Sequence, residues 1–397
     1  MFVSMSPSAA VDSGSPLRVG YAVAWNRDPR TTWSHTPWSL RQAMQRLTAL
    51  HLTDIHLTMP SWRKQALKAW HITRYQGRWM SGWGHSPVAY RDHHASMLRS
   101  VANADLDVLL EIGDWGDAPL PSFVYQDYSY LHLEHDHARN GFWTPQYDYH
   151  SERMLRKRID IQRRTIGTHR GIMTMSAWDA QFMAASGLID PDRIHVVPPG
   201  MNVDPMPLDP ADADIDPSKE FRVVFVGRDP WRFIKPKAGD MVVDAVRKLH
   251  SGGRRIRLVI VGPAWLPMPD PLPSWLTLVP DASFDQVRYE LQLADVFCMP
   301  SRFEAFGMAF IEALGSGIPV IGRNAYAMPE FIRHGDNGYL LSEHGTTDEL
   351  ASLIDATLGD SAMRARVIAQ APAIAEYYTW DRAANDMYRI MRKAVDA

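Results

Sequence analysis

Residues 294–322 read ADVFCMPSRFEAFGMAFIEALGSGIPVIG, and this stretch decides the fold. An apolar strand is predicted over Asp295–Met299, a short helix over Met308–Gly315 and a second strand over Ile318–Ile321. Strand, helix and strand in this order form a βαβ unit, which requires a parallel sheet. The free backbone N–H groups at the start of such a helix form a binding site for an anion such as a diphosphate.

Two carboxylates flank the start of that helix. Glu304 lies in the loop before it and Glu312 lies within it, and each can accept two strong hydrogen bonds from sugar or ribose hydroxyls. Gly307 stands between them and allows the backbone to approach a ligand closely. We therefore expect this loop and helix to bind a hydroxyl-rich, phosphorylated ligand.

The alternation of strands and helices continues through the C-terminal half. It predicts three further strands (Phe221–Val226, Ile256–Val261 and Leu276–Val279), two helices (Asp240–His250 and Phe284–Leu293) and a mostly helical region over residues 346–397, with Thr347 as an N-cap. Such a pattern is typical of a doubly wound α/β domain.

The N-terminal half shows the same pattern less regularly. A helix is predicted from Pro37 and a basic helix over Ser151–Arg170, with a polar loop over Trp25–Thr36. The predicted strands are Leu17–Val23, Leu50–Leu57, Asp107–Ile112, Ser122–Tyr125, Gly171–Met175 and His195–Val197. Two Rossmann-like, doubly wound parallel-sheet domains in tandem place the carboxyl ends of both sets of strands across a cleft.

The predicted domain boundaries follow from composition. Residues 1–16 are rich in Ser, Ala and Pro and form a disordered lead-in, and residues 17–203 form the first domain. Residues 204–219 are rich in Pro and Asp and form a linker. Residues 220–375 form the second domain. Residues 376–397 form a C-terminal helix that can pack back on the first domain.

Composition excludes several classes. The 397 residues are 46% hydrophobic and 22% charged, which is typical of a globular protein, and the net charge of −3 argues against nucleic-acid binding. The single cysteine, Cys298, cannot form an intrachain disulfide and suits a reducing compartment. Residues 1–16 lack the apolar core of a signal peptide, and no apolar run is long enough to span a bilayer. We expect a soluble, cytoplasmic protein.

The loop and helix closely resemble the signature of the retaining glycosyltransferase family 4, which has the GT-B fold. That signature is P-S-x-x-E-x-F-G, followed by E-A-x-x-x-G-x-P-V-I. The matching residues here are Pro300, Ser301, Glu304, Phe306, Gly307, Glu312, Ala313, Gly317, Pro319 and Val320.

The resemblance implies roles for these residues. Glu304 would contact the donor sugar and Glu312 the ribose, and the backbone amides of Phe306, Gly307, Met308 and Ala309 would face the diphosphate or the sugar. The family transfers a sugar from a nucleotide sugar with retention of configuration and usually without a metal. We accordingly expect a UDP- or GDP-sugar as co-substrate and no metal site.

A second segment also resembles the family. Residues 223–239 read VVFVGRDPWRFIKPKAG, and the family ends this strand with Gly-Arg and places a Lys shortly after it. Gly227 and Arg228 match, and counting back from Asp240 selects Lys237, with Lys235 as the alternative. The two cations would neutralise the leaving diphosphate, which gains negative charge in the transition state.

In relatives of this family, the loop after the first strand carries paired glycines and often approaches the donor phosphates. Here the loop is residues 31–37, with Ser34, His35 and Thr36 in place of the glycines, so a plain β–α turn is an equal alternative. Many relatives have a His at the end of an N-domain strand, and the residue at that position here is Asp127. Its carboxylate would bond to the donor sugar or take the acceptor's proton.

Other side chains of the first half have open roles. His132, His135 and His137 lie in LHLEHDH, which does not match the HExxH spacing of zinc sites. Solvated surface is the default for them, with one lining the cleft or a metal site as alternatives. Nine of the 14 tryptophans precede residue 150 and would either stack on acceptor sugars or fill the core.

Two more resemblances complete the pattern. Pro329, Glu330 and the run 337–340 resemble the loop and hairpin that follow the donor site in relatives. The basic segment Arg63–Arg78 could lie on an anionic membrane, but a solvated helix face is the favoured interpretation.

The sequence thus predicts a glycosyltransferase that moves a sugar from a nucleotide-diphosphate sugar to a hydroxyl on a glycan, glycolipid, protein or small molecule. A nucleotide-sugar epimerase of the same architecture and a non-catalytic nucleotide-sugar-binding protein are the alternatives.

Overall fold

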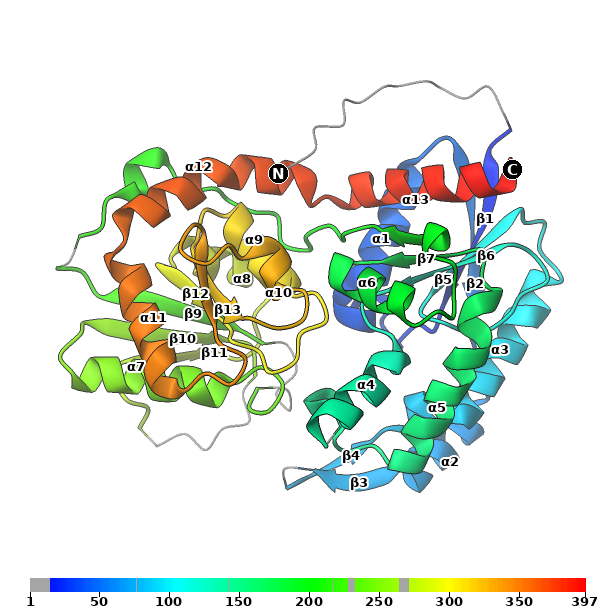
Figure 1. The fold of residues 1–397 in the computed structure, drawn as a ribbon, viewed down its shortest axis with the longest axis horizontal. Helices are drawn as coiled ribbons and strands as arrows, with labels where there is room; N and C mark the ends of the chain where they lie inside the picture. The colour runs from blue at the N-terminus through cyan, green and yellow to red at the C-terminus, as the bar shows by residue number, and fades with distance from the viewer. Residues whose placement is uncertain (1–14, 76, 142, 217, 228–232, 264–270) are drawn as a thin grey trace.

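The computed structural model describes residues 15–397 apart from 76, 142, 217, 228–232 and 264–270. The described chain forms two lobes, each built on a sheet with helices around it (Figure 1). The predicted lead-in, residues 1–16, lies outside the described residues except for its last two positions.

The first lobe contains six parallel strands and one antiparallel hairpin. The parallel strands are β1 (Leu17–Val23), β2 (Leu50–His56), β5 (Val108–Ile112), β6 (Ser122–Gln126), β7 (Gly171–Thr174) and β8 (Ile194–Val196), in the spatial order β2-β1-β5-β6-β7-β8. The hairpin is β3 (Ile72–Tyr75) with β4 (Arg78–Ser81). The helices are α1 (Thr36–Arg46), α2 (Ser61–Trp70), α3 (Pro87–Val101), α4 (Tyr130–Asn140), α5 (Glu152–Thr165) and α6 (Ala177–Ala185).

The second lobe repeats this strand order. Its strands are β9 (Phe221–Val226), β10 (Ile256–Val261), β11 (Leu276–Val279), β12 (Val296–Cys298), β13 (Val320–Arg323) and β14 (Gly338–Leu341), in the order β11-β10-β9-β12-β13-β14. All neighbouring strands of this sheet pair in parallel. The helices are α7 (Gly239–Ser251), α8 (Phe284–Gln292), α9 (Met308–Gly315), α10 (Met328–Phe331), α11 (Thr347–Gly359), α12 (Ser361–Tyr377) and α13 (Trp380–Val395).

The strands form because their residues are apolar and are buried on both faces of a sheet. All five residues of β5 and all five of β6 are buried, as expected for parallel strands covered by helices. In each sheet the strand order reverses at one point, between β1 and β5 and between β9 and β12. Ligands of doubly wound sheets bind outside the carboxyl ends of the strands at such a point.

The chain crosses between the lobes twice, and the two crossings lie together. The first crossing follows β8, and the second joins α12 to α13. Met201 N donates to Tyr378 O at 2.9 Å, and a Cβ on Gly200 would lie 2.2 Å from Trp380 N, so only glycine fits there. The helix α13 then runs along the first lobe beside α1 (Figure 1).

Most of the predicted elements are confirmed, including the exact bounds of β1, β9, β10, β11 and α9. Four details were wrong. Thr346, not Thr347, caps α11 with its side chain, because its hydroxyl accepts from Glu349 N. The basic helix ends at Thr165 rather than at Arg170. The expected hairpin at 337–340 is β14, a sixth parallel strand.

The fourth correction concerns the polar loop over Trp25–Thr36, where Pro29–His35 (η1) contains short 3₁₀ turns separated by a kink at Thr32, Trp33 and Ser34, whose backbone is not helical. Asp28 starts this segment, since its side chain accepts from Arg30 N at 3.0 Å. The linker region 204–219 also contains a 3₁₀ turn, Pro210–Ala213 (η6), with a capping box at Asp209.

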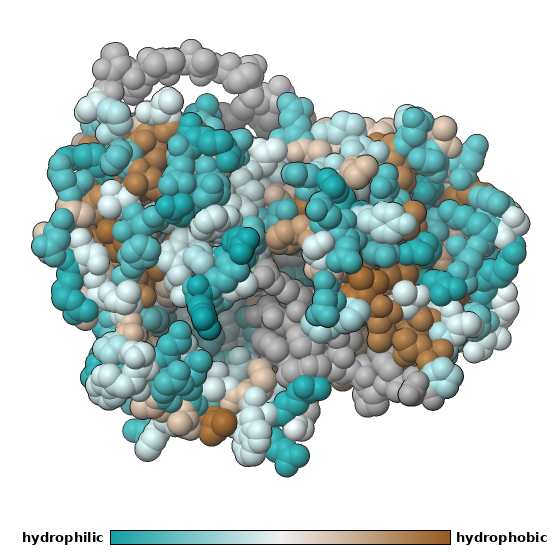
Figure 2. All heavy atoms as spheres, turned by 180° about the vertical axis from the view of Figure 1, so that it is seen from behind, coloured by the Kyte–Doolittle hydropathy of each residue, from teal (hydrophilic) through white to brown (hydrophobic). Residues whose placement is uncertain are grey.

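The surface seen from behind is mostly hydrophilic, with hydrophobic patches on both lobes (Figure 2). Among the residues that the structure describes, no helix combines the length and apolarity needed to cross a bilayer.

Candidate active site

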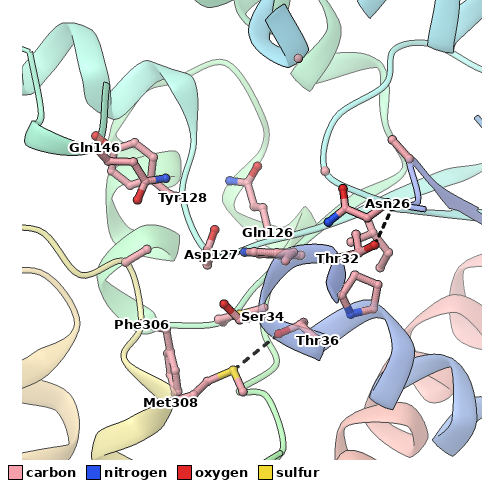
Figure 3. Close-up of a pocket in the computed structure, with 18 of the residues that line it drawn as sticks. Asn26, Thr32, Ser34, Thr36, Gln126, Asp127, Tyr128, Gln146, Phe306 and Met308 are labelled. Atoms are coloured by element: carbon pink, nitrogen blue, oxygen red, sulfur yellow. Dashed lines mark hydrogen bonds between the residues drawn. The ribbon is translucent and has the colours of Figure 1, made fainter. Parts of the chain in front are cut away.

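A cavity of about 830 Å³ lies between the lobes at the two points where the strand orders reverse. Its wall is formed by the segments that follow β1, β5 and β6 in one lobe and β9 and β12 in the other. Figure 3 shows both sides, with Ser34 and Asp127 from the first lobe opposite Phe306 and Met308 from the second. The volume is in the range of pockets that bind small molecules and cofactors.

Three helices near this cavity start in the same unusual way. The N-caps of α1, α7 and α9 are His35, Ala238 and Gly307, all in the left-handed region of the backbone and none with a side-chain cap. In contrast, α3, α4, α6, α8, α11 and α13 each begin at a Ser or Thr whose hydroxyl accepts a backbone N–H. At α9 this leaves the first backbone N–H groups open to an anion, as the sequence predicts. At the other two helices the first N–H is already used, since Thr36 N donates to Trp33 O and Gly239 N donates to Phe233 O.

The segment before α9 holds the predicted carboxylate close to a cation. Glu304 pairs with Lys237 Nζ and also lies 3.4 Å from Ser301 Oγ. Gly307 has φ of 98°, and a Cβ there would lie 2.8 Å from Phe310 Cδ2. This turn therefore requires glycine, and it brings Phe306, Met308 and Ala309 to the cavity wall.

The two candidate lysines have different surroundings. Lys237 lines the cavity, whereas Lys235 pairs with Asp148 of the first lobe at 2.8 Å and lies 5.2 Å from the centre of the Tyr75 ring. Gly227, at the end of β9, also lines the cavity. Arg228 lies outside the described residues.

Glu312 points from α9 toward the crossing between the lobes. Its Oε1 accepts from Asn202 N at 3.0 Å and from Val203 N at 3.2 Å. Burial raises the pKa of Glu312 to about 7, although the two backbone hydrogen bonds act in the opposite direction. Glu312 also lines the cavity, so a hydroxyl-rich ligand can reach it.

The loop after β1 takes a glycine-like path without glycine. Trp33, Ser34 and His35 have φ of 38°, 53° and 75°, a region that side chains disfavour. Contacts from outside the loop hold it: Trp33 Nε1 donates to Asp127 Oδ2 at 3.2 Å, and Asn202 Nδ2 donates to Ser34 O at 2.7 Å. The His35 ring packs edge-on against a residue of the other lobe, Phe284, at 5.0 Å.

This loop reaches the second lobe directly. Thr36 Oγ1 lies 3.5 Å from Met308 Sδ, so the first residues of α1 and α9 are in contact (Figure 3). The sequence leaves a plain turn as an alternative, and the structure instead places Ser34 and Thr36 in the cavity wall, with His35 beside it.

Asp127 follows β6 and lines the same cavity. Withdrawal from bulk water raises its pKa to about 7, the hydrogen bond from Trp33 lowers it, and the nearby charges of Asp179 and Glu304 raise it again. A carboxylate with a pKa near neutrality exists in both protonation states under physiological conditions, which suits proton transfer.

The prediction that His132, His135 and His137 lie on the solvated surface is wrong for one of them. His132 is buried, bonds to Asp179 Oδ1 at 2.8 Å through Nε2 and is stacked on Trp178 and Phe182. His135 is exposed and His137 half-buried. His132 is a core residue because α4 turns it inward, whereas the sequence shows only three closely spaced imidazoles.

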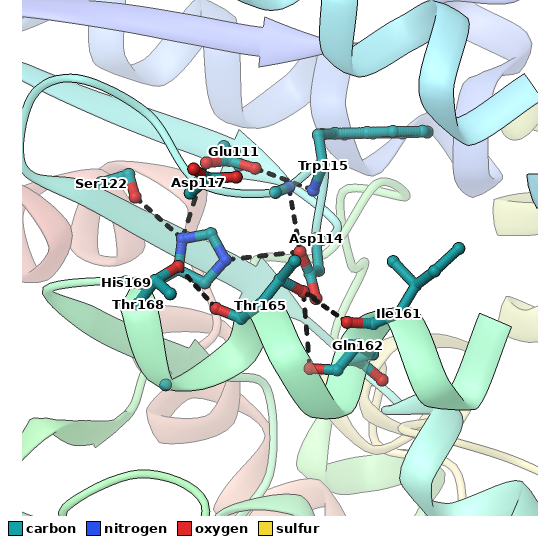
Figure 4. Close-up of polar contacts among 12 residues, drawn as sticks. Glu111, Asp114, Trp115, Asp117, Ser122, Ile161, Gln162, Thr165, Thr168 and His169 are labelled. Atoms are coloured by element: carbon teal, nitrogen blue, oxygen red, sulfur yellow. Dashed lines mark hydrogen bonds and ion pairs between the residues drawn. The ribbon is translucent and has the colours of Figure 1, made fainter. Parts of the chain in front are cut away.

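A buried polar network in the first lobe was not predicted from the sequence. His169 Nδ1 lies 2.8 Å from Ser122 Oγ and 3.6 Å from Glu111 Oε1, and its Nε2 lies 3.3 Å from Asp114 Oδ1 (Figure 4). Among the described residues, these two carboxylates and His169 are the group whose spacing could hold a metal ion. The carboxylates approach opposite ring nitrogens, so the arrangement is that of a clamped imidazole.

Ionisation in this network follows from burial and charge. Burial raises the pKa of Glu111 to about 8. Burial alone would also raise the pKa of Asp114, but hydrogen bonds and charge from His169 and Thr165 outweigh it and lower that pKa. Burial would lower the pKa of His169, but the two carboxylates raise it.

Several lining residues were not predicted. They include Asn26, Lys64, Gln126, Tyr128, Gln146, Arg158 and Asn202. Four of the tryptophans that were expected either to stack on acceptor sugars or to fill the core also line the cavity: Trp25, Trp33, Trp83 and Trp115. Three others, Trp62, Trp70 and Trp79, are 69–83% exposed on α2 and β4. Asn202 lies in the crossing and joins Ser39, Ser34 and Trp380, long-range contacts that leave no signal in the sequence.

Comparison with known proteins agrees with this geometry. Residues 220–360 match the family of glycosyl transferases group 1, so the second lobe carries a domain of that family. The chain is 31% identical over 225 residues to a D-inositol 3-phosphate glycosyltransferase of Rhodococcus opacus (strain B4), covering 52% of this chain and 49% of that protein. The chain spans about half the length of the curated relatives it matches.

Solved structures share the whole architecture. The sucrose-phosphate synthase of Thermosynechococcus elongatus aligns over 95% of this chain and 98% of its own, with a TM-score of 0.67 and 14% identity. The Anabaena protein HepE in complex with UDP and glucose aligns over 95% of this chain and 100% of its own, with a TM-score of 0.62 and 14% identity. The two parallel-sheet lobes therefore form a GT-B fold.

Proposed function

We propose that this protein is a retaining glycosyltransferase that moves a sugar from a nucleotide-diphosphate donor to an acceptor hydroxyl. The observation that carries the proposal is the cavity between the lobes. In it the uncapped start of α9, the ion pair of Lys237 with Glu304, and Glu312 all line one wall. A helix start and a lysine suit a diphosphate, and carboxylates suit sugar hydroxyls.

The donor would bind mainly to the second lobe. Its diphosphate would face the amides of Phe306, Gly307, Met308 and Ala309, with Lys237 and Arg228 neutralising the charge that develops on departure. Lys235 is not needed, because Asp148 already pairs with it. Glu304 would orient the sugar, and Glu312 would bind the ribose.

The acceptor would enter from the first lobe. Asp127 lies on that side of the cavity and has a pKa near 7, so its ionised form would take the proton of the acceptor hydroxyl. The hydroxyl would attack the face of the sugar from which the diphosphate leaves, and the configuration would be retained. The loop around Ser34, His35 and Thr36 would close over the donor phosphates.

The structural relatives suggest the donor. HepE has been solved with UDP and glucose and with UDP-glucose, which supports a UDP-sugar as the first candidate here, with a GDP-sugar as the alternative. No part of this proposal requires a metal. The buried single cysteine, Cys298, supports a reducing, cytoplasmic compartment.

Binding of UDP, GDP and ADP, measured by calorimetry, tests the donor site. We expect one nucleoside diphosphate to bind clearly better than the others and to bind more weakly to Arg228→Ala. Because no donor contact in this proposal involves Lys235, Lys235→Ala is the matched control. No binding of any of the three to a folded protein would overturn the proposal.

Turnover separates transfer from the alternatives. A glycosyltransferase releases nucleoside diphosphate and forms a glycoside only when acceptor is present, whereas an epimerase converts the donor without one. A non-catalytic binder releases none. We expect Glu304→Ala to abolish nearly all transfer while leaving the melting temperature close to that of the unaltered protein. A near-normal rate would remove Glu304 from the site.

A further inference from the structure

In the described part of the first lobe, one buried cation lacks hydrogen-bond partners on two of its nitrogens, although its charge acts on Asp114 and lowers the pKa of that carboxyl. Arg158, on α5, lines the cavity and is 5% exposed, yet its Nε and Nη1 have no hydrogen-bond partner among the described residues. Withdrawing a charged group from water without giving it acceptors is costly. Such a group in the wall of a cavity indicates that a ligand completes its hydrogen bonding.

Two aromatic rings fix the guanidinium but do not satisfy it. Arg158 Cζ lies 4.3 Å from the centre of the Tyr90 ring and 4.8 Å from that of Tyr130. Contacts with ring faces stabilise the cation, whereas its N–H groups lie along the edge of the plane and still need oxygen acceptors. The planar arrangement of those N–H groups matches the oxygens of a phosphate or a carboxylate.

The two carboxylates of the buried network, Asp114 and Glu111, do not pair with Arg158. Asp114 accepts from Thr165 Oγ1 at 2.8 Å and from Gly116 N at 3.1 Å, and its Oδ1 faces His169 Nε2 at 3.3 Å. Among the described residues, no carboxylate oxygen lies within 4.0 Å of the Arg158 guanidinium. Glu111 retains its proton at neutral pH, because burial raises its pKa to about 8.

A second cation lies at the same end of the cavity. Lys64 lines it and lies 5.1 Å from the centre of the Trp83 ring. Both cations act on one residue, His93. Burial and the charges of Arg158 and Lys64 lower its pKa to about 4 against the opposing charge of Asp92, so the ring is neutral near pH 7. The Nδ1 of this buried ring also has no partner among the described residues.

Each carboxylate in the cavity wall already has a hydrogen-bond or ion-pair partner. Glu304 pairs with Lys237, Glu312 accepts from two backbone amides, and Asp127 accepts from Trp33. The cavity therefore has unused donors on Arg158, whereas the carboxylates in its wall are already bonded.

We propose that the acceptor carries an oxyanion, a phosphate or a carboxylate, which binds to Arg158 and Lys64 in the first-lobe end of the cavity. This inference rests on the proposed glycosyltransferase function and adds the chemical class of its acceptor. Binding of the oxyanion holds the acceptor in the part of the cavity that also contains Asp127.

The first experiment titrates inorganic phosphate, and separately acetate, into protein saturated with the nucleoside diphosphate that binds best, so that the donor phosphate site is occupied. We expect saturable binding of one or both anions, weakened about tenfold or more in Arg158→Met. The matched control is Arg164→Met, which removes the same charge from an exposed position of the same helix and should leave anion affinity unchanged.

The second experiment measures nucleoside diphosphate release with paired compounds that differ only in the anion: glucose, glucose 6-phosphate and glucuronate. We expect the phosphate or the carboxylate member to stimulate release at least tenfold more than glucose, and the stronger of the two identifies the oxyanion. Lys64→Met, at a half-buried position, should reduce this difference and serves as the second variant if Arg158→Met does not fold.

The outcomes separate the two proposals. If no nucleoside diphosphate binds, the proposed function fails, and this inference fails with it. If nucleoside diphosphate binds normally but anion affinity is the same in Arg158→Met, Lys64→Met and the control, the proposed function stands and the anionic acceptor is wrong.

Discussion

The starts of α1 and α9 meet across the cavity, and they reach the same backbone conformation with different residues. Gly307 precedes α9 with φ of 98°, and His35 precedes α1 with φ of 75°, after Trp33 and Ser34 in the same region. Neither helix has a side-chain cap. Both helices therefore follow a left-handed backbone turn, but only the second lobe has a glycine there that reveals the turn in the sequence.

The difference extends to how each turn is held. In the second lobe, glycine takes the left-handed conformation without steric cost. In the first lobe, three side-chain residues take it, and hydrogen bonds to Asp127 and from Asn202 hold them there. Strain maintained by surrounding contacts is common at functional sites. The first-lobe loop is thus coupled to the residue that we propose as the base and to the crossing between the lobes.

The largest effect is expected at the first-lobe carboxylate. Asp127→Asn should lower the rate of transfer about 100-fold or more, because the amide cannot take the acceptor's proton. In the unaltered protein the rate should rise with pH through about 7, as Asp127 loses its proton, and then level off. The check is the pH profile of kcat, from which Asn should remove this rise.

The same pH profile distinguishes a base from a structural role for Asp127. A pH profile with the same rise in Asp127→Asn would show that Asp127 is not the base and acts, at most, by holding Trp33. Nucleoside diphosphate affinity is the control, since the donor site lies mainly on the other lobe and should change less than about threefold.

The next effect is expected at the second-lobe cation. Lys237→Ala should weaken nucleoside diphosphate binding about 10- to 100-fold, the usual value of a charge-assisted hydrogen bond to phosphate. Lys235→Ala should change it less than about threefold, because Lys235 is half-exposed and paired with Asp148. Equal losses in the two variants, measured by calorimetry, would contradict the assignment of Lys237.

Some features of the two lobes were predictable from the sequence and others were not. The elements of both lobes were predictable because buried parallel strands are apolar runs and helices alternate with them, as in β9 and α9. Glu304, Gly307 and Glu312 were predictable because one continuous segment contains them. Counting back from Asp240 selected Lys237 over Lys235, but the ion pair that distinguishes Lys235 was not predictable, because its partner Asp148 lies 87 positions away.

The first-lobe site was harder to predict for a similar reason. Arg158 belongs to a helix that the sequence shows only as basic, and its burial depends on packing against Tyr90 and Tyr130 from other helices. His132 was expected at the surface because its partner, Asp179, lies 47 positions further along the chain. Side chains brought together by long-range packing leave no local pattern.

A smaller effect is expected on stability at Glu312. Its pKa of about 7 in the folded protein is above the 4.5 of an unperturbed glutamate, so the folded state binds the proton more tightly than the unfolded state. The resulting stability is full below about pH 4.5 and is lost as the pH rises through 7. Glu312→Gln removes this loss, while its amide oxygen can still accept from Asn202 and Val203.

We therefore expect Glu312→Gln to be more stable than the unaltered protein at pH 8, by roughly 3 kcal/mol, and about equally stable at pH 4.5. Denaturant unfolding at the two pH values provides the measurement. Glu349→Gln is the control with the opposite sign, because its backbone hydrogen bonds lower its pKa. A stability difference that does not change with pH would contradict the raised pKa of Glu312.

The smallest effect tests the two turns against each other. Ser34→Gly should stabilise the protein by up to about 1 kcal/mol, because relief of the left-handed strain exceeds the entropy that glycine loses on folding. Gly307→Ala should instead destabilise it by about 2 kcal/mol, since the new Cβ would lie 2.8 Å from Phe310 Cδ2 at a φ of 98°. Thermal unfolding of both variants measures these effects.

Ser352→Gly, in the helix α11 where glycine has only its usual cost of about 1 kcal/mol, is the control that isolates the backbone conformation. If Ser34→Gly is as destabilising as that control, the first-lobe turn is not strained, and its side chains, rather than its backbone, distinguish it from the turn at Gly307.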